Sequence, residues 1–331
     1  MQFETDNQKA QRLVANAASE IQNYRVERSL SKLESAKEIL DEARREDPQY
    51  LSAIYYTAVL DDLLGKAHDA IPSLEKILKA DPPFSDEVRY HLGMAYYHRY
   101  NSENLDRAIE CFKRVFEAAP DSILRTSACA ALGQAYAMKI IPTTPQSVDA
   151  GKIREYHHLS VYEGQQSLKL ADELDKGQQH EELNEPRWMA HNALGMANMY
   201  FSDYEGKADQ KIEVLKSTID QFSLANEYRP KDWANYCDLA SAHMRLGYWS
   251  STLSHFKAAE KLLRSVITNL RPEYGFAIYE LGRNFRLQGD FDKAIFHFDR
   301  ALSIPYETRD VSDRRVNIEK ERAIREDSVF P

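Results

Sequence analysis

The sequence has few cysteines and no long apolar run. Its three cysteines, Cys111, Cys129 and Cys237, have neither metal-binding nor disulfide-framework spacing. We therefore expect buried thiols in a reducing compartment. No apolar stretch is long enough to span a bilayer, and the first residues lack the basic segment and apolar run of a secretory signal. These absences predict a soluble cytoplasmic protein.

Glycine, proline and positive charge are also scarce. The chain has 12 glycines and 12 prolines, too few for a linker-rich or disordered protein, while 43% hydrophobic residues are ample for a core. Lys and Arg number 43 against 52 Asp and Glu, which gives a formal net charge of −9. This balance argues against a general affinity for nucleic-acid phosphates, which requires clustered cations.

Motifs of catalysis and metal binding are missing as well. The sequence contains no phosphate-binding P-loop, no nucleophile elbow, no H-E-x-x-H zinc motif and no glycine-rich dinucleotide loop. His157 and His158 are adjacent, so on a helix they point about 100° apart and cannot hold one ion together. We expect no enzyme, no metal and no cofactor.

The most informative pattern runs from Gly275 to Pro305, where two helices and a turn are predicted. One face of the first helix carries residues at i, i+3, i+4 and i+7, namely Ile278, Leu281, Gly282 and Phe285. Small and aromatic residues alternate on the second helix, at Ala294, Phe298 and Ala301. Pro305 ends that helix because it lacks an amide donor.

The same pattern recurs upstream. Leu92-Gly93-x2-Tyr96 is followed by an A-x3-F pattern at Ala108 and Phe112 and by a closing proline, and Leu132-Gly133 and Leu194-Gly195 begin two further copies. This resembles the tetratricopeptide repeat, whose signature is W-x2-L-G-x2-Y, then A-x3-F, then P, over about 34 residues.

The resemblance implies an all-α fold, a right-handed α-solenoid superhelix of about seven helix pairs. We expect one continuous repeat domain over residues 1–305 and a charged C-terminal capping helix and tail over 306–331. Gly133, Gly195 and Ala240 hold equivalent places but lie more than one period apart. Two insertions are therefore predicted, near 139–152 and 201–210.

Tetratricopeptide arrays in general bind peptides or protein segments in a concave groove lined by the first helix of each pair. The family register puts the following residues in that groove: Tyr55, Val59, Asp62, Tyr90, Met94, Tyr97, His98, Gln134, Met138, Met189, Asn192, Met196, Met199, Tyr200, Met244, Arg245, Phe276, Tyr279, Arg283 and Arg286.

Methionine and tyrosine in this set suit a binding groove, because methionine adapts its shape and tyrosine offers area at low entropic cost. The alternative is that these residues pack against neighbouring helices. Arg245, Arg283 and Arg286 could bind carboxylates of a partner or pair with carboxylates of the chain itself. The lysine and asparagine clamp by which some family members hold chaperone tails is absent.

Three functions follow as hypotheses. The leading one is a non-catalytic adaptor or scaffold that binds a peptide or protein segment in its groove, and acidic groups on that partner are a further hypothesis. The second is a regulatory receptor similar to the peptide-sensing tetratricopeptide proteins of bacteria. The third is a constitutive subunit of a larger complex. The identity of the partner, the biological process and the oligomeric state are not encoded in the repeat pattern.

Overall fold

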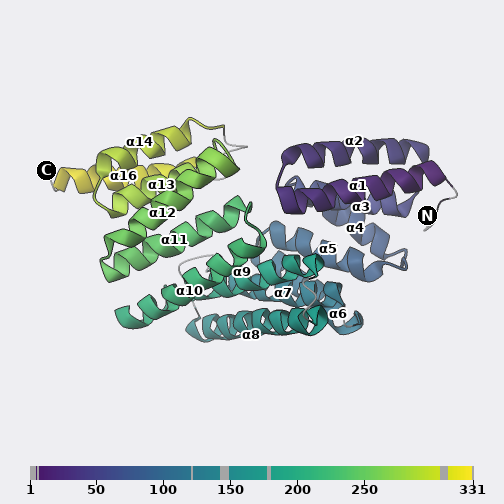
Figure 1. Cartoon of the computed structure of the whole chain (residues 1–331), viewed down its shortest axis with the longest axis horizontal. Coiled ribbons are helices and arrows are strands. Elements are labelled where there is room, and N and C mark those ends of the chain that lie inside the picture. Colours follow the sequence, from purple (N-terminus) through teal and green to yellow (C-terminus); the bar gives the residue numbers. More distant parts are fainter. Residues whose placement is uncertain are drawn as a thin grey trace. The chain divides into compact units, whose positions relative to one another are not determined.

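The chain folds into helices throughout the part that the structure describes. The computed structural model describes residues 5, 7–120, 122–141, 149–176, 180–305 and 312–329. Within these ranges no β-strand forms, and α1 to α14 make seven successive helix pairs followed by α16 (Figure 1). The predicted all-α solenoid with a C-terminal helix is confirmed.

The chain divides into two compact units, Met1–Ala197 (unit 1) and Asn198–Pro331 (unit 2). Unit 1 contains α1 (Gln8–Glu27), α2 (Leu30–Glu46), α3 (Leu51–Leu63), α4 (Ala67–Leu78), α5 (Ser85–His98), α6 (Ser102–Ala118), α7 (Ile123–Lys139), α8 (Ala150–Asp175), the short η1 (Glu181–Leu183) and most of α9 (Asn184–Phe201). Unit 2 contains the end of α9, then α10 (Ala208–Tyr228), α11 (Trp233–Ser250), α12 (Leu253–Ser265), the π-helical turn η2 (Val266–Leu270), α13 (Gly275–Leu287), α14 (Phe291–Leu302) and α16 (Asp313–Val329). The predicted domain boundary at residue 305 stays a prediction.

Helices of a pair approach closely where a glycine on the first faces an aromatic ring on the second. The contacts are Gly93 with Phe112, Gly247 with Phe256 and Gly282 with Phe298. A Cβ atom at Gly93 or at Gly282 would lie 2.6 Å from a ring carbon, closer than van der Waals contact allows. The L-G and A-x3-F elements of the repeat are therefore two halves of one packing contact.

In two of the pairs, a glycine also forms the turn between the first and the second helix. Gly65 (φ +78°) and Gly289 (φ +79°) adopt the left-handed conformation directly after a first helix. A side chain in that conformation would be strained, and glycine avoids the strain because it has no Cβ. The second helix can then start within two residues and fold back antiparallel.

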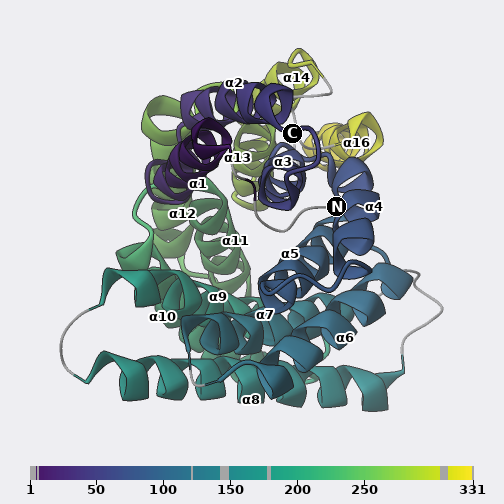
Figure 2. The same ribbon diagram turned by 90° about the vertical axis from the view of Figure 1, so that its right-hand side faces the viewer.

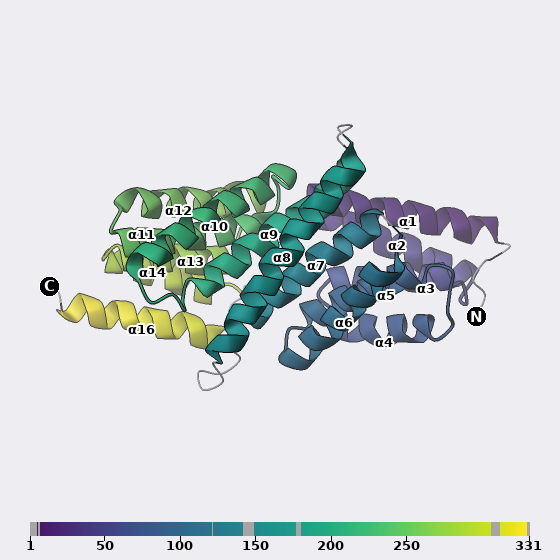
Figure 3. The same cartoon turned by 90° about the horizontal axis from the view of Figure 1, so that it is seen from below.

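The fourth pair is unusual because α8 is 26 residues long and lies against the alanine-rich α7 (Figure 3). Ser160 Oγ donates a 2.7 Å hydrogen bond to the Gly133 carbonyl, and Ser167 Oγ donates to the Thr126 carbonyl at 3.0 Å. Gly164 on α8 in turn leaves room for Leu194 of α9. Small residues thus let three helices of unit 1 pack closely.

The extra residues of the fourth and fifth repeats lengthen helices. Besides α8, the structure shows α10 with 21 residues, whereas α14 of the last pair has 12. Part of the insertion predicted near 139–152 falls on residues 142–148, which lie outside the described residues. The insertion predicted near 201–210 corresponds to the end of α9, the connection at 202–207 and the start of α10.

Each unit has its own apolar core. In unit 1 the pairs α1/α2, α3/α4 and α5/α6 follow one another (Figure 2). They share a continuous cluster of buried side chains that extends to α7 and α9. In unit 2 a second cluster joins α11, α12, α13, α14 and α16. Within each unit, buried residues between successive pairs hold the stack together, as expected for a repeat array.

Helix α16 covers the last pair by packing on α14 and α13 (Figure 1). Its buried face carries Val316, Glu319 and Ala323 at helical spacing. A carboxylate thus lies among the apolar contacts of this face. The segment 306–311 that precedes α16 lies outside the described residues.

Candidate functional site

The predicted groove residues all belong to first helices of pairs. Within unit 1, α1, α3, α5 and α7 contact one another in that order, and within unit 2, α11 contacts α13. We call the surface that the first helices form within a unit the first-helix face of that unit. The residues lie as follows: Tyr55 on α3; Tyr90, Met94, Tyr97 and His98 on α5; Gln134 and Met138 on α7; Asn192, Met196, Met199 and Tyr200 on α9; Met244 and Arg245 on α11; Tyr279, Arg283 and Arg286 on α13.

Half of these side chains are buried by the protein itself. The buried ones are Tyr55, Tyr90, Gln134, Asn192, Met196, Met199, Met244 and Tyr279. Gln134 Nε2 donates a 2.9 Å hydrogen bond to Asn192 Oδ1, and the Tyr90 hydroxyl reaches Met189 Sδ at 3.6 Å. Side chains of α5, α7 and α9 therefore meet one another on the first-helix face of unit 1.

His91 lies at the centre of a polar contact between α1, α3 and α5. Its Nε2 is 3.1 Å from Arg25 Nη2 and its Nδ1 is 2.8 Å from the Tyr55 hydroxyl. Because a guanidinium can only donate, Nε2 must accept, so the imidazole is neutral with its proton on Nδ1. Burial, and next the Arg25 charge, lower the pKa of His91 to about 3. We assign His91 a structural role.

The carboxyl-terminal ends of α5 and α7 remain more open. His98 Nδ1 lies 3.0 Å from both carboxylate oxygens of Asp62, and 39% of the His98 side chain is exposed. Met94 and Tyr97 on α5 and Met138 on α7 are partly exposed. We call Met94, Tyr97, His98 and Met138 the open patch. It joins adaptable apolar side chains to one polar pair.

The three predicted groove arginines have carboxylate partners inside unit 2. Arg245 pairs with Asp203, and Arg283 Nη1 lies 2.8 Å from both oxygens of buried Glu280. Arg286 lies 2.9 Å from Glu319 and 2.9 Å from Glu326, and thereby attaches α16 to α13. The intramolecular pairing left open by the sequence is the arrangement observed.

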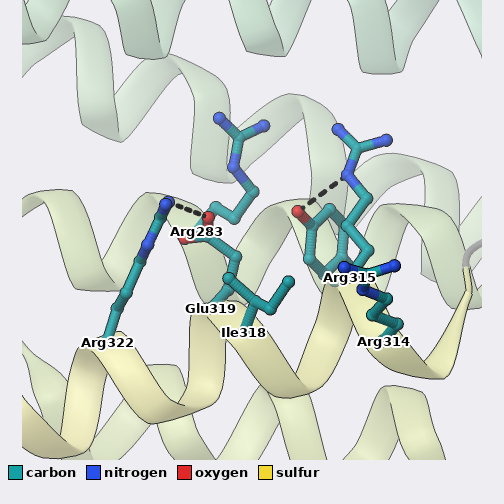
Figure 4. A pocket seen from close by; sticks show the side chains of 7 residues that line it. Arg283, Arg314, Arg315, Ile318, Glu319 and Arg322 are labelled. Atoms are coloured by element: carbon teal, nitrogen blue, oxygen red, sulfur yellow. Dashed lines mark hydrogen bonds and ion pairs between the residues drawn. The ribbon is translucent and has the colours of Figure 1, made fainter. Parts of the chain in front are cut away.

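A cavity of about 290 Å³ lies between α13 and α16 (Figure 4). Its lining includes Tyr279, Arg283, Arg314, Arg315, Glu319 and Arg322. Arg315 Nε donates a 3.1 Å hydrogen bond to the Tyr279 hydroxyl, and Arg322 Nη1 donates to Glu319 at 2.7 Å. We call this cavity the arginine pocket. It combines two predicted groove residues, Tyr279 and Arg283, with residues of the C-terminal helix.

The sequence predicts a charged capping helix, but not that arginines of α16 line a pocket with residues of α13. A signal was present in the sequence. Val316 and Ala323 are seven residues apart and define a buried face, beside which Arg315 and Arg322 share the same seven-residue spacing.

Several carboxylates lie on the side of Arg283 that is opposite the arginine pocket. Burial raises the pKa of Asp238 on α11 to about 7, and the neighbouring carboxylates of Asp232 and Glu280 add to this rise. Like charges close together disfavour ionisation. The surroundings of Glu280 and Arg283 are thus rich in carboxylates toward α11 and rich in arginines toward α16.

Two other kinds of feature, a metal centre and a membrane-spanning helix, are absent from the described part of the chain. Its residues contain no group of three or more His, Cys, Asp or Glu side chains that could hold a metal ion. None of its helices is both long enough and apolar enough to cross a membrane.

These features define a class, an all-α repeat protein whose first helices lie side by side within each unit. Residues 64–123 match the family model described as tetratricopeptide repeat. The chain also resembles a tetratricopeptide repeat protein from Parabacteroides merdae, with 12% identity, a TM-score of 0.51, and coverage of 96% of this chain and 100% of that one. Residues 64–123 thus carry the tetratricopeptide repeat that the sequence pattern predicted, and the whole chain has the fold of a tetratricopeptide-repeat protein.

A second solved structure resembles the chain with a lower TM-score. It is a thermophilic protein of the same repeat type from Thermus thermophilus, with 14% identity, a TM-score of 0.46, and coverage of 72% of this chain and 98% of that one. No curated protein matches the sequence. At these identities the structural likeness concerns the fold alone.

Proposed function

We propose that the chain is a non-catalytic scaffold that binds a segment of a partner protein at the open patch on the first-helix face of unit 1. The observation that carries the proposal is that α3, α5 and α7 lie side by side while the open patch stays accessible at the ends of α5 and α7. Repeat arrays present extended faces of this kind to their ligands.

The chemistry of the open patch suits a peptide. Met94 and Met138 can adapt to apolar side chains, and Tyr97 offers a large surface with few torsions to immobilise. The Asp62 and His98 pair adds hydrogen-bonding groups beside them, at 3.0 Å from each other. Apolar anchors next to a polar pair can bind a segment and fix its orientation.

Acidic groups on the partner form the second part of the proposal. Arg283, Arg314 and Arg315 of unit 2 line one cavity and supply the donors that carboxylates or phosphates require. We also propose a cytoplasmic location. All three cysteines are free, and burial raises the pKa of the Cys129 and Cys237 thiols, so they stay protonated and unreactive.

One observation favours the alternative of a subunit held in a larger complex. Tyr248, Trp249 and Leu253 are 59%, 40% and 54% exposed around the turn between α11 and α12. Large apolar side chains grouped at a surface are typical of protein contacts. A subunit of this kind would lose its partner on Leu253→Asp, whereas the scaffold proposal expects the open-patch partner to remain.

The test of the scaffold proposal uses two tyrosines. The full chain would capture partners from a cytoplasmic extract as wild type, as Tyr97→Ala and as Tyr162→Ala, since Tyr162 on α8 is 51% exposed and lies outside the first-helix face. We expect Tyr97→Ala to lower recovery at least fivefold and Tyr162→Ala to leave it unchanged. Equal recovery with all three proteins would exclude the open patch as the binding site.

A further inference from the structure

We propose that the arginine pocket between α13 and α16 binds a phosphate monoester, presented as a phosphorylated side chain of a protein segment. This inference deepens the acidic-partner part of the proposed function, on which it rests, but it is independent of the open patch. The pocket has a volume of about 290 Å³, and Arg283 reaches it from α13 while Arg315 and Arg322 reach it from α16 (Figure 4).

The lining carries an excess of positive charge. Four guanidinium groups, of Arg283, Arg314, Arg315 and Arg322, line the pocket together with one carboxylate, Glu319. Arg283 is neutralised by Glu280 behind it, at 2.8 Å. Glu319 is shared, because Arg322 approaches it at 2.7 Å and Arg286 at 2.9 Å.

Two guanidinium groups are left over from these pairs. Neither Arg314 nor Arg315 has a carboxylate partner among the residues that the structure describes. Arg315 is nonetheless held in place, because its Nε donates to the Tyr279 hydroxyl at 3.1 Å and its guanidinium lies 5.2 Å from the centre of the same ring. Its two terminal nitrogens can therefore serve a ligand without losing this contact.

The backbone of α16 adds to the excess of positive charge at the pocket. Arg314 and Arg315 lie in the first turn of α16, a helix of 17 residues. The amino-terminal end of a helix carries partial positive charge, so cations there are disfavoured unless an anion is near. Asp313 supplies one carboxylate in the same turn, and a bound anion would offset the charge of the two arginines further.

Charge and geometry favour a phosphate over a carboxylate. A phosphate monoester carries about −1.5 to −2 charges at neutral pH and three acceptor oxygens, enough to neutralise two guanidinium groups. A single carboxylate would leave one positive charge uncompensated. Planar guanidinium groups also bind phosphate oxygens in pairs, which makes arginine the usual partner of phosphorylated side chains.

The test measures binding of a short synthetic phosphoserine peptide to the full chain by isothermal titration calorimetry. Matched probes are the same peptide with serine, the same peptide with glutamate, and inorganic phosphate. The variants are Arg314→Gln alone, Arg314→Gln with Arg315→Gln, and the control Arg325→Gln. Arg325 is on the same helix, 81% exposed and paired with Glu321.

We expect saturable binding of the phosphoserine peptide, weakened at least tenfold by the double variant and at least threefold by Arg314→Gln. The control should stay within twofold of wild type. Raised salt should weaken binding to the wild type more than to the double variant, since charge-assisted contacts are screened. Arg314 makes no hydrogen bond or ion pair with the described residues, so its single variant should keep the wild-type melting temperature.

Three results would each overturn the inference. Equal binding of the glutamate peptide would mean a carboxylate site, and equal binding of inorganic phosphate would mean that a free anion is the ligand. Absence of saturable binding of the phosphopeptide would remove the site. Because Tyr97→Ala acts in unit 1, its effect on partner capture separates failure of the scaffold proposal from failure of this one.

Discussion

Single residues set the closest contacts in this protein, and Gly282 shows how. A Cβ atom there would lie 2.6 Å and 2.7 Å from two carbons of the buried Phe298 ring. Exchanging glycine for alanine within a helix normally stabilises by about 1 kcal/mol. Overpacking in a dense core costs about 1–3 kcal/mol, so the steric term should decide the outcome.

We therefore expect Gly282→Ala to lower the free energy of unfolding by about 1–2 kcal/mol, and Gly282→Leu to lower it further. Gly206→Ala is the matched control, because no atom lies within 4 Å of its Cβ position. Denaturant titration of both variants checks the prediction. A stability equal to that of the control would show that Phe298 can move aside without cost.

His91 controls a second property at the residue scale, the response to acid. The folded-state pKa of His91 is lowered from 6.5 to about 3, because burial and the Arg25 charge disfavour its protonation. The unfolded chain thus binds a proton at higher pH than the folded chain. The contribution of His91 to stability is complete above pH 6.5 and is lost as the pH falls from 6.5 toward 3.

At pH 5 this loss should amount to about 2 kcal/mol. His91→Gln keeps polar atoms near Arg25 and Tyr55 but removes the titration, so the stability of unit 1 should fall less on acidification than in the wild type. Hydrogen exchange of α5 peptides at pH 7 and pH 5 reports on unit 1. His158→Gln, on an exposed part of α8, is the control, and an unchanged acid response in His91→Gln would contradict the assignment.

At the scale of elements, Arg286 determines how α16 is attached. The arginine pairs with Glu319 on the buried face of α16 and with Glu326 one to two turns later. Its removal would leave Glu319, whose side chain is 10% exposed, with Arg322 as the remaining partner. Breaking a buried ion pair costs about 3–5 kcal/mol, and the remaining arginine should reduce that cost.

We expect Arg286→Ala to lower stability by about 2 kcal/mol and to increase hydrogen exchange in α16 more than in α11. Arg325→Ala, which alters an exposed pair, should change stability by less than about 0.5 kcal/mol. Wild-type exchange of α16 in Arg286→Ala would mean that Val316 and Ala323 are sufficient to hold the helix.

The helices and the turns between them were also the features that the sequence predicted best. Helix pairs and their turns follow from local patterns, because Gly282 and Phe298 encode one contact and Gly289 encodes the turn beside it. The contacts of Arg286 could not be read in this way. Its partners lie on a helix some forty residues later, and only the tertiary packing of α16 brings Glu319 and Glu326 to it.

At the scale of the whole molecule, sequence register placed the first helices but not the exposure of their side chains. Tyr90 and Asn192 hold groove positions in the family pattern, yet α5, α7 and α9 approach so closely that both are buried. The number of pairs was predictable because each pair is a local unit. Burial depends on how successive pairs stack, which a single repeat does not encode.

The division into two units predicts that a destabilising substitution increases hydrogen exchange only in the unit that contains it. Each unit has a separate core cluster, and stability in repeat arrays is carried by contacts between neighbours. Gly93→Ala, whose Cβ would lie 2.6 Å from Phe112, should increase hydrogen exchange within residues 1–197, and Gly282→Ala should do so within 198–331. Increased exchange of both units in either variant would show that they unfold together.

The cover that α16 places over the last pair has a further consequence. A stack of like pairs ends in a surface shaped to receive another pair, so a second copy of the chain could add there and start a filament. In this protein that surface is occupied by α16, whose other side carries Glu321 and Arg325 to the solvent. By covering the last pair, α16 presents a charged surface where an added pair would otherwise pack.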